Sequence, residues 1–279
     1  MPNVIACVDA HVHLHSCYDP DDLLRNACDN LAAARSDADQ QGPVAYFLLL
    51  AECASDDCFG ALRALAHGQP ASGGSPPLRL QRWTVAPTSE DISVVARDAG
   101  RELFIVAGRQ VACREGLEVL VLGTTHRFAD GRPIREVLRE ADALGVPRVI
   151  PWGPGKWFFR RGRLLTELVR EFRKPTLFLG DEGGRPVFWG YPQHFERAAR
   201  LGVRDLPGTD PLPFAHDVGK VGRMGIRIPI DLDPARPGGS LLRALTQSRA
   251  PLERFATLEP PLRFVRNQIG MQLRKRLRA

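Results

Sequence analysis

The segment Val8–His15 reads VDAHVHLH and concentrates side chains that can bind a metal ion. Because successive side chains of a β-strand point to opposite faces, Asp9, His11, His13 and His15 are predicted to share one face. Two imidazoles one residue apart can direct a ring nitrogen each at one divalent cation. The spacing predicts that His11 and His13 bind one zinc, manganese or iron ion, with a hydrogen-bonded pair of core histidines as the alternative. We expect His15 to face a loop or solvent.

Carboxylates that could complete such a site follow other predicted strands. Asp210, in LPGTDPLPF, follows the last strand of an alternating pattern of strands and helices. It is the candidate for a metal ligand or for the base that takes a proton from metal-bound water. Glu52 ends an apolar strand and Asp181 follows another, so both are further candidate ligands. Glu52 could equally be solvated at the rim of the fold, and Asp181 could pair with Arg185 in a tight turn.

Two basic residues are candidates for binding an anionic group of a small-molecule substrate. Lys156 lies among glycines and a proline in WGPGKW, where the backbone allows a ligand to approach closely. Arg185 follows two glycines in GDEGGR. The alternatives are a solvated helix start for Lys156 and the internal pair with Asp181 for Arg185.

Strands and helices that alternate along the chain must position these residues. Strands are predicted at 3–14, 44–53, 78–86, 92–98, 102–113, 117–124, 146–152, 175–181 and 203–210, and helices at 19–38, 59–67, 133–145, 160–174 and 192–202. Such alternation indicates an α/β fold with parallel strands and crossover helices. In these folds the carboxyl ends of the strands carry the site, so the candidate residues are expected to converge at one mouth.

The segment VDAHVHLH resembles the first-strand metal motif of the amidohydrolase superfamily and the start of PHP (polymerase and histidinol phosphatase) domains. Residues 102–124 and 206–225 resemble later segments of the same families. The resemblance implies a distorted, TIM-like β/α barrel over residues 1–250, seven-stranded in the PHP case. It also implies a metal-dependent hydrolase that uses metal-activated water on an ester, amide or phosphoester.

Three positions depart from the PHP pattern. Gln110 stands where a glutamate ligand would follow VAGR, Trp152 stands where a histidine would follow VPRVIP, and Pro211–Leu212 replaces an alanine–histidine pair. We therefore expect one metal ion or none, not the three of a complete PHP site. The alternative function is a non-catalytic PHP-like barrel that serves as a binding or scaffold protein.

The charge of the chain is concentrated at its C-terminal end. The net charge is +6, and residues 262–279 contain six basic residues and no acidic ones, so the rest of the chain is neutral. This balance argues against a broad nucleic-acid surface, and binding of nucleic acid through the tail is the weakest alternative. Residues 251–279 are predicted to form a basic, amphipathic helical tail that packs on the barrel; weak contact with an anionic membrane surface or an acidic partner is the alternative.

The N-terminal sequence lacks the basic and apolar regions of a signal peptide, and no apolar run approaches the roughly 18 residues of a membrane span. The sequence therefore predicts a cytoplasmic protein with reduced cysteines.

Overall fold

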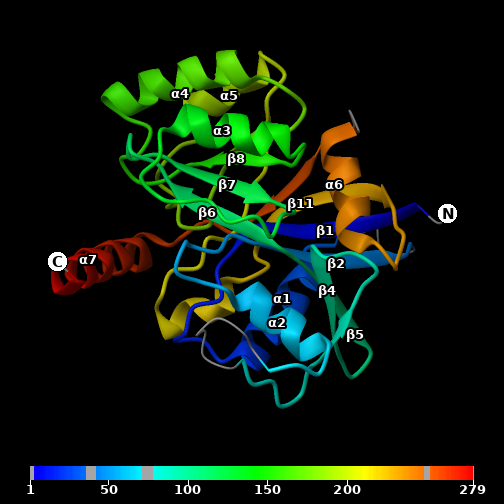
Figure 1. Cartoon of the computed structure of the whole chain (residues 1–279). Coiled ribbons are helices and arrows are strands. Elements are labelled where there is room, and N and C mark those ends of the chain that lie inside the picture. Colours follow the sequence, from blue (N-terminus) through cyan, green and yellow to red (C-terminus); the bar gives the residue numbers. More distant parts are fainter. Residues whose placement is uncertain (1–2, 36–41, 71–77, 248–251, 279) are drawn as a thin grey trace.

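The strands form two mixed sheets, and helices cover the outer face of each (Figure 1). The computed structural model describes residues 3–35, 42–70, 78–247 and 252–278. The first sheet has the strand order β12-β11-β1-β2-β5-β4-β3: β1 Asn3–Val12, β2 Val44–Leu50, β3 Thr84–Pro87, β4 Ser93–Asp98, β5 Arg101–Val106, β11 Met224–Asp231 and β12 Glu253–Ala256. The second has the order β10-β9-β8-β7-β6: β6 Gly108–Ala112, β7 Glu118–Leu122, β8 Arg148–Pro151, β9 Leu177–Gly180 and β10 Arg204–Asp205.

Most of the described helices pack on one of the two sheets. The described helices are α1 Pro20–Ala33, α2 Cys58–Ala66, α3 Ile134–Ala143, α4 Phe159–Phe172, α5 Gln193–Ala199, the 3-10 helix η2 Ala215–Lys220, α6 Pro237–Gln247 and α7 Pro261–Arg278. The start of α1 is as predicted: Pro20 occupies its first turn, and the Asp19 carboxylate accepts a hydrogen bond from the backbone N–H of Asp22. Among the described residues, no helix has the length and apolar character needed to cross a membrane.

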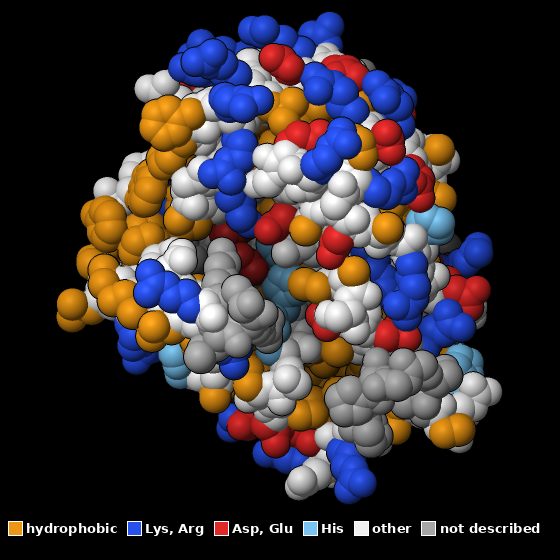
Figure 2. Space-filling model, turned by 60° about the vertical axis from the view of Figure 1, so that its left-hand side comes forward, with side chains coloured by type: hydrophobic (Ala, Val, Ile, Leu, Met, Phe, Trp, Pro, Cys, Tyr) orange, Lys and Arg blue, Asp and Glu red, His pale blue; other side chains and the backbone are white. Residues whose placement is uncertain are grey.

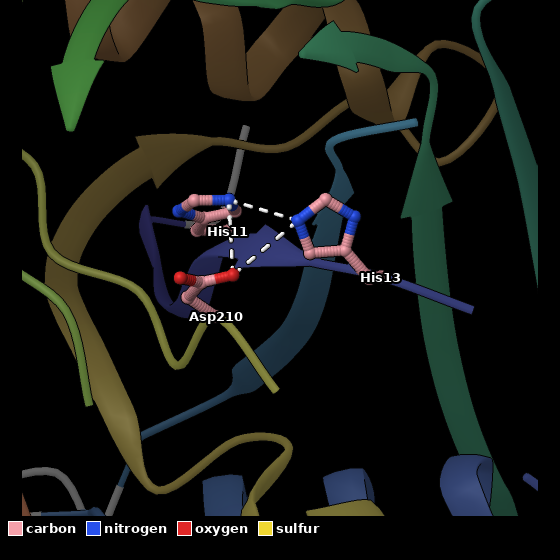
Figure 3. Close-up of side chains that lie close together, drawn as sticks. All are labelled: His11, His13 and Asp210. Atoms are coloured by element: carbon pink, nitrogen blue, oxygen red, sulfur yellow. Dashed lines mark hydrogen bonds and ion pairs between the residues drawn. The ribbon is translucent and has the colours of Figure 1, made fainter. Parts of the chain in front are cut away.

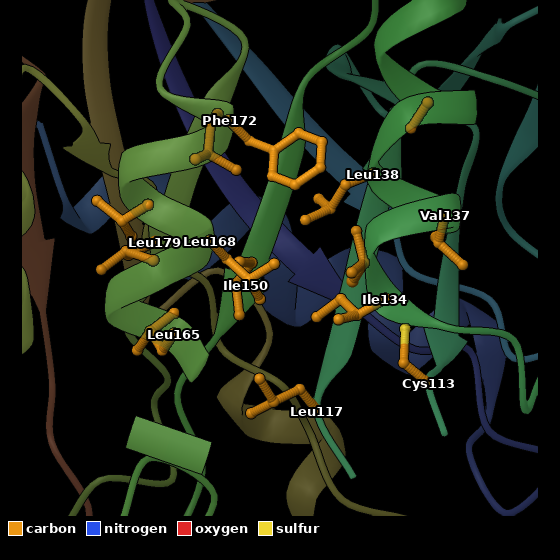
Figure 4. Close-up of a cluster of buried hydrophobic side chains, with 14 of the residues drawn as sticks. Cys113, Leu117, Ile134, Val137, Leu138, Ile150, Leu165, Leu168, Phe172 and Leu179 are labelled. Atoms are coloured by element: carbon orange, nitrogen blue, oxygen red, sulfur yellow. The ribbon is translucent and has the colours of Figure 1, made fainter. Parts of the chain in front are cut away.

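Three hydrophobic layers hold these elements together. Apolar side chains of α3, α4 and α5 pack on the second sheet (Figure 4). Those of α1 and α2 pack on the first sheet. A third layer fills the space between the sheets, and its members include Val8, Ala10, Phe47, Leu49, Leu120, Leu122, Val149 and Phe178. Because both faces of the central strands are covered, these strands read as nearly continuous apolar runs in the sequence.

The predicted α/β class is confirmed, but the strand pairing is more mixed than the alternation suggested. Parallel pairs join β1 to β2, β2 to β5, β8 to β9 and β9 to β10. Antiparallel pairs join β3 to β4, β4 to β5, β6 to β7 and β7 to β8. The predicted strand 102–113 is two strands in different sheets, because the chain leaves β5 at Val106 and enters β6 at Gly108.

The C-terminal part of the chain contributes more to the sheets than its sequence indicated. Strand β11, which was not predicted, lies antiparallel to β1 as the second strand of the first sheet. Strand β12 then pairs antiparallel with β11. Residues 253–256, expected to belong to a helical tail, therefore extend the first sheet as β12, and the helix begins only at Pro261.

At one end of the fold, backbone contacts link the two sheets on both of their flanks. On one flank Glu52 bridges to Arg109, and the Gln110 N–H donates to the Glu52 carbonyl at 2.8 Å. On the other flank the Asp210 N–H donates to the His11 carbonyl at 2.9 Å. These links lie near the end of β1 and beyond the ends of β2 and β10, which is the end where the sequence places its candidate site residues.

Candidate metal centre

Two histidines and one carboxylate converge at the end of β1 (Figure 3). His11 Nε2 lies 3.1 Å from His13 Nε2, and Asp210 Oδ1 lies 3.5 and 3.4 Å from these two nitrogens. Adjacent donors around an ion bound at about 2.1 Å are separated by about 3.0–3.5 Å, so the three atoms fit the first coordination shell of one divalent cation. His11, His13 and Asp210 thus form a candidate metal-binding triad.

The hydrogen-bonding pattern of His11 also favours the binding of a cation. Its Nε2 faces His13 Nε2 and Asp210 Oδ1, and Gln110 Oε1 lies 2.9 Å away. One ring nitrogen carries at most one proton and cannot donate hydrogen bonds to three acceptors at once. Nδ1 of His13 is buried and has no hydrogen-bond partner among the described residues. An excess of lone pairs over protons in a buried place is what a bound cation would balance.

Burial sets the protonation of this cluster. Burial lowers the pKa of His11 to about 4, which favours the neutral imidazole that metals bind. Burial alone would raise the pKa of Asp210, but the neighbouring His11, His13 and Lys156 hold it well below its usual range. The triad therefore offers two imidazole nitrogens and one anionic oxygen, which is a donor set that suits zinc, manganese or iron.

An irregularity near the end of β1 determines the directions of the histidine side chains. The pairing of β1 with β2 shifts between Asp9 and Val12, and β1 ends at Val12, so His13 lies in the loop that follows. The strict alternation predicted for VDAHVHLH is consequently broken. His15 lies beside the triad without belonging to it, because its ring stacks on His13 at 5.3 Å and its Nε2 contacts the Pro211 carbonyl at 2.9 Å.

Asp9 fastens the segment that carries Asp210 to β1. Its buried carboxylate accepts hydrogen bonds from the Thr209 N–H and hydroxyl at 2.9 and 2.5 Å, from the Gly222 N–H at 2.9 Å and from the His11 N–H at 3.3 Å. Burial raises the pKa of Asp9 to about 6 against the opposing effect of these bonds. Asp9 is therefore a positioning residue and not a member of the triad.

Three charged side chains surround the triad. Glu182 is buried, and its Oε1 lies 4.0 Å from His11 Nδ1. Burial and then the charge of Asp210 raise the pKa of Glu182 well above its usual value. Lys156 forms an ion pair of 2.5 Å with Glu118, and the charges of Glu118 and Glu182 raise the pKa of Lys156 although burial opposes them. Lys156 thus supplies positive charge beside an otherwise acidic site.

The structure places two predicted ligands outside the triad. Glu52 is buried in an ion pair of 2.9 Å with Arg109, and its Oε1 accepts a hydrogen bond from the Phe59 N–H. The Asp181 carboxylate accepts hydrogen bonds from two guanidinium groups. Arg185 donates to both of its oxygens at 2.9 Å, and Arg254 donates to Oδ2 at 2.6 Å. Both carboxylates are neutralised by arginine and so are occupied without a metal.

Arg185, the second predicted substrate-binding residue, is buried by the same contacts. Besides Asp181, its guanidinium donates to the Trp189 carbonyl at 2.7 Å. This is the internal pair that the sequence offered as the alternative for Arg185. Lys156, in contrast, keeps about a quarter of its side chain exposed.

The positions that depart from the PHP pattern have different surroundings. Gln110 lies against His11, so the glutamine stands at the triad itself. Trp152 is buried in the core of the second sheet and packs edge-on against Trp189, with ring centroids 5.5 Å apart. Pro211 contributes its carbonyl to His15, and Leu212 accepts a hydrogen bond from the Tyr18 hydroxyl.

Two neighbours of the site, Glu118 and Glu182, were not predicted as site residues. Glu118 begins β7, which runs antiparallel to β8, so the rule that strands end at the site could not find it. Glu182 directly follows Asp181, and both carboxylates come after β9. The sequence therefore does not distinguish which of the two approaches the triad. The space-filling view shows a hollow in which histidine and acidic side chains are visible, with basic side chains above it (Figure 2).

The chain matches no family model and no curated protein. Among solved structures it is similar to PsfC from Pseudomonas syringae PB-5123, with 18% identity and a TM-score of 0.54 over 98% of this chain and 99% of that one. It is also similar to the lesion-specific endonuclease PfuEndoQ from Pyrococcus furiosus, with 11% identity and a TM-score of 0.49, over 90% of this chain and 58% of that one. The similarity to PsfC shows that the two chains share an overall fold.

Proposed function

We propose that this protein is a metal-dependent hydrolase whose divalent ion is held by His11, His13 and Asp210. The observation that carries the proposal is the convergence of His11 Nε2, His13 Nε2 and Asp210 Oδ1 within 3.5 Å of one another. A divalent ion bound there would lower the pKa of a coordinated water toward about 7 and so supply hydroxide near neutral pH. The substrate class is an ester, amide or phosphoester.

The residues around the triad have distinct parts in this proposal. Asp210 is held ionised, so it can bind the ion or accept a proton. Lys156 is the partly exposed cation at the site and would bind an anionic group of the substrate. Arg185 is engaged by Asp181 and Trp189, so we assign it to positioning of the segment after β9.

We propose that the two sheets together form the distorted barrel that the PHP resemblance implies. The links between Glu52 and Gln110 on one flank and between His11 and Asp210 on the other support this arrangement. They connect β1, β2, β6 to β9 and the chain after β10 into a ring at the end that carries the triad.

The proposal is tested by metal content. Protein purified without chelators is analysed by elemental analysis, as the parent and as the His11→Ala/His13→Ala double variant. We expect about one divalent ion per parent chain and loss of the ion from a double variant that stays folded by circular dichroism. His67→Ala, which changes an exposed histidine, is the matched control and should retain the ion. Equal metal content in parent and double variant would contradict the proposed site.

A second candidate function is a non-catalytic barrel that binds a ligand. Gln110 favours it, because an amide replaces a carboxylate at 2.9 Å from His11. Screening the metal-loaded parent against phosphoesters, lactones and amides separates the two functions. Turnover that is lost in the double variant supports the hydrolase, whereas full metal occupancy without turnover supports the binding protein.

A further inference from the structure

Helix α7 packs against the protein with its polar side chains and exposes its aliphatic ones. Asn267 is buried and contacts His216, and Arg263 donates to Asp217 at 3.0 Å. The opposite face exposes four aliphatic residues spaced three or four apart, with exposed fractions of 51–87%: Leu262, Val265, Ile269 and Leu273. A surface helix normally packs its aliphatic stripe against the protein. Helix α7 instead turns this stripe to the solvent and its polar side chains to the protein.

The orientation of α7 is fixed by close packing. Gly270 lies so near Phe214 that a Cβ atom would come within 2.7 Å of the ring, and Arg274 lies over the same ring at 5.5 Å from its centroid. Phe264 contacts Phe188 at a centroid distance of 5.9 Å. These contacts hold the opposite face of α7 against the protein, and the aliphatic stripe faces outward.

Exposed aromatic residues continue this apolar surface. Phe188 and Val187 are more than half exposed and adjoin α7 through Phe264. Phe158 stacks on Trp189, which also contacts Phe264, and the neighbouring Phe159 is 89% exposed. Phe159 also has a φ of 51°, a left-handed conformation that is costly for a bulky residue. Figure 2 shows hydrophobic side chains gathered along one edge of the molecule.

The charge around this apolar surface is positive. Arg266 and Arg276 are exposed on α7, and Arg160 and Arg163 are exposed beside Phe159. The sequence of α7 contains no acidic residue, and Asp217, which Arg263 binds, is completely buried. A second copy of the chain would bring these arginines together, and nucleic acid would leave the aliphatic stripe uncovered. An anionic lipid bilayer has an apolar interior and a negatively charged surface, so it matches both the aliphatic stripe and the arginines.

We propose that the stripe on α7 and the adjoining aromatic residues bind the surface of an anionic lipid bilayer. The aliphatic and phenylalanine side chains enter the boundary between headgroups and acyl chains, and the arginines contact lipid phosphates. This interaction does not depend on metal or on catalysis at the triad.

The test is sedimentation of the full-length protein with lipid vesicles. Vesicles of phosphatidylcholine with roughly 30% phosphatidylglycerol are compared with vesicles of phosphatidylcholine alone. We expect binding to the anionic vesicles only, weakened about tenfold or more by Val265→Ser/Ile269→Ser and by Arg266→Glu/Arg276→Glu. Leu144→Ser and Arg236→Glu, at exposed positions on other elements, should bind as the parent does.

Several results would overturn the proposal. They are absence of binding to anionic vesicles, equal binding to neutral vesicles, and equal binding by the α7 variants and their controls. Light scattering after gel filtration provides an independent check. A dimer that Val265→Ser/Ile269→Ser converts to a monomer would assign the stripe to a second copy of the chain instead.

Discussion

Gly208 lies directly against His11, and a Cβ atom at position 208 would come within 2.3 Å of the His11 backbone nitrogen. No such approach is tolerated between real atoms, so any larger residue must push the chain after β10 away from β1. That chain segment carries Asp210, whose N–H donates to the His11 carbonyl at 2.9 Å. The contact between Gly208 and His11 thus sets the distance between the carboxylate and the imidazoles of the triad.

The first prediction concerns Gly208→Ala. We expect the added methyl group to displace Asp210 and to weaken metal binding about 10–100-fold, as changes in the residues that support metal ligands do. The free energy of unfolding should fall by about 1–3 kcal/mol because of overpacking. Metal titration and urea unfolding measure the two effects. Gly184→Ala is the matched control, because nothing lies within 4 Å of its Cβ position. Unchanged metal affinity in Gly208→Ala would show that Gly208 does not position the site.

The second prediction concerns Gln110→Glu. The amide oxygen of Gln110 is 2.9 Å from His11 Nε2, and glutamate has nearly the same shape. A carboxylate there adds a negative charge next to the bound cation, so we expect metal affinity to rise by about tenfold or more. Calorimetric titration of the apoprotein with zinc or manganese checks this. Gln193→Glu, at an exposed position on α5, controls for charge alone. An affinity that stays at the parent value would place Gln110 outside the coordination sphere.

The third prediction concerns thiol reactivity and its pH dependence. Burial raises the pKa of Cys28, Cys53, Cys58 and Cys113 to about 12 in each case. Only the thiolate reacts, so near pH 8 about one in ten thousand of these thiols is reactive, and the fraction grows as pH rises. Cys17 is exposed. With a chromogenic disulfide reagent we expect one fast thiol in the native protein.

The matched variant for this experiment is Cys17→Ser, which should remove the fast phase and leave the slow reactions unchanged. A fast phase that survives in Cys17→Ser would mean that one of the other five thiols is reactive in the native fold.

The three members of the triad were among the five metal ligands predicted from the sequence, because these residue types are rare together and lie at or after the ends of predicted strands. Asp210 comes 199 residues after His11 and 197 after His13, yet β1 and the segment after β10 meet at the same end of the two sheets. The parallel strands and the start of α1 were predictable for a similar reason, since local pattern and turn residues determine them.

Other features depend on contacts that local sequence does not reveal. Strand β11 is preceded by glycines and reads as a loop, and its pairing with β1 decides its conformation. Glu52 and Asp181 follow strands as ligands would, but Arg109 and Arg254 reach them from distant segments. A strand-end rule finds the carboxylates near a site and cannot tell which of them an arginine has already neutralised.

The last prediction separates the two roles of Asp210. This residue has a φ of 43°, in the left-handed region that asparagine also tolerates, so Asp210→Asn should keep the local backbone. If the carboxylate is a ligand, the variant should bind metal about 10–100-fold more weakly, because an amide oxygen carries no charge. If it is only a base, metal binding should persist while turnover falls by about 10²–10⁴.

Metal occupancy and turnover are therefore measured side by side in the parent and in Asp210→Asn. The matched control is Asp91→Asn, at a carboxylate that is 89% exposed, where neither quantity should change. Because Asp210 Oδ1 lies within 3.5 Å of both histidine nitrogens, we expect the ligand result, with metal and turnover lost together. If both measurements in Asp210→Asn equalled those of the parent, Asp210 would have no part in the site.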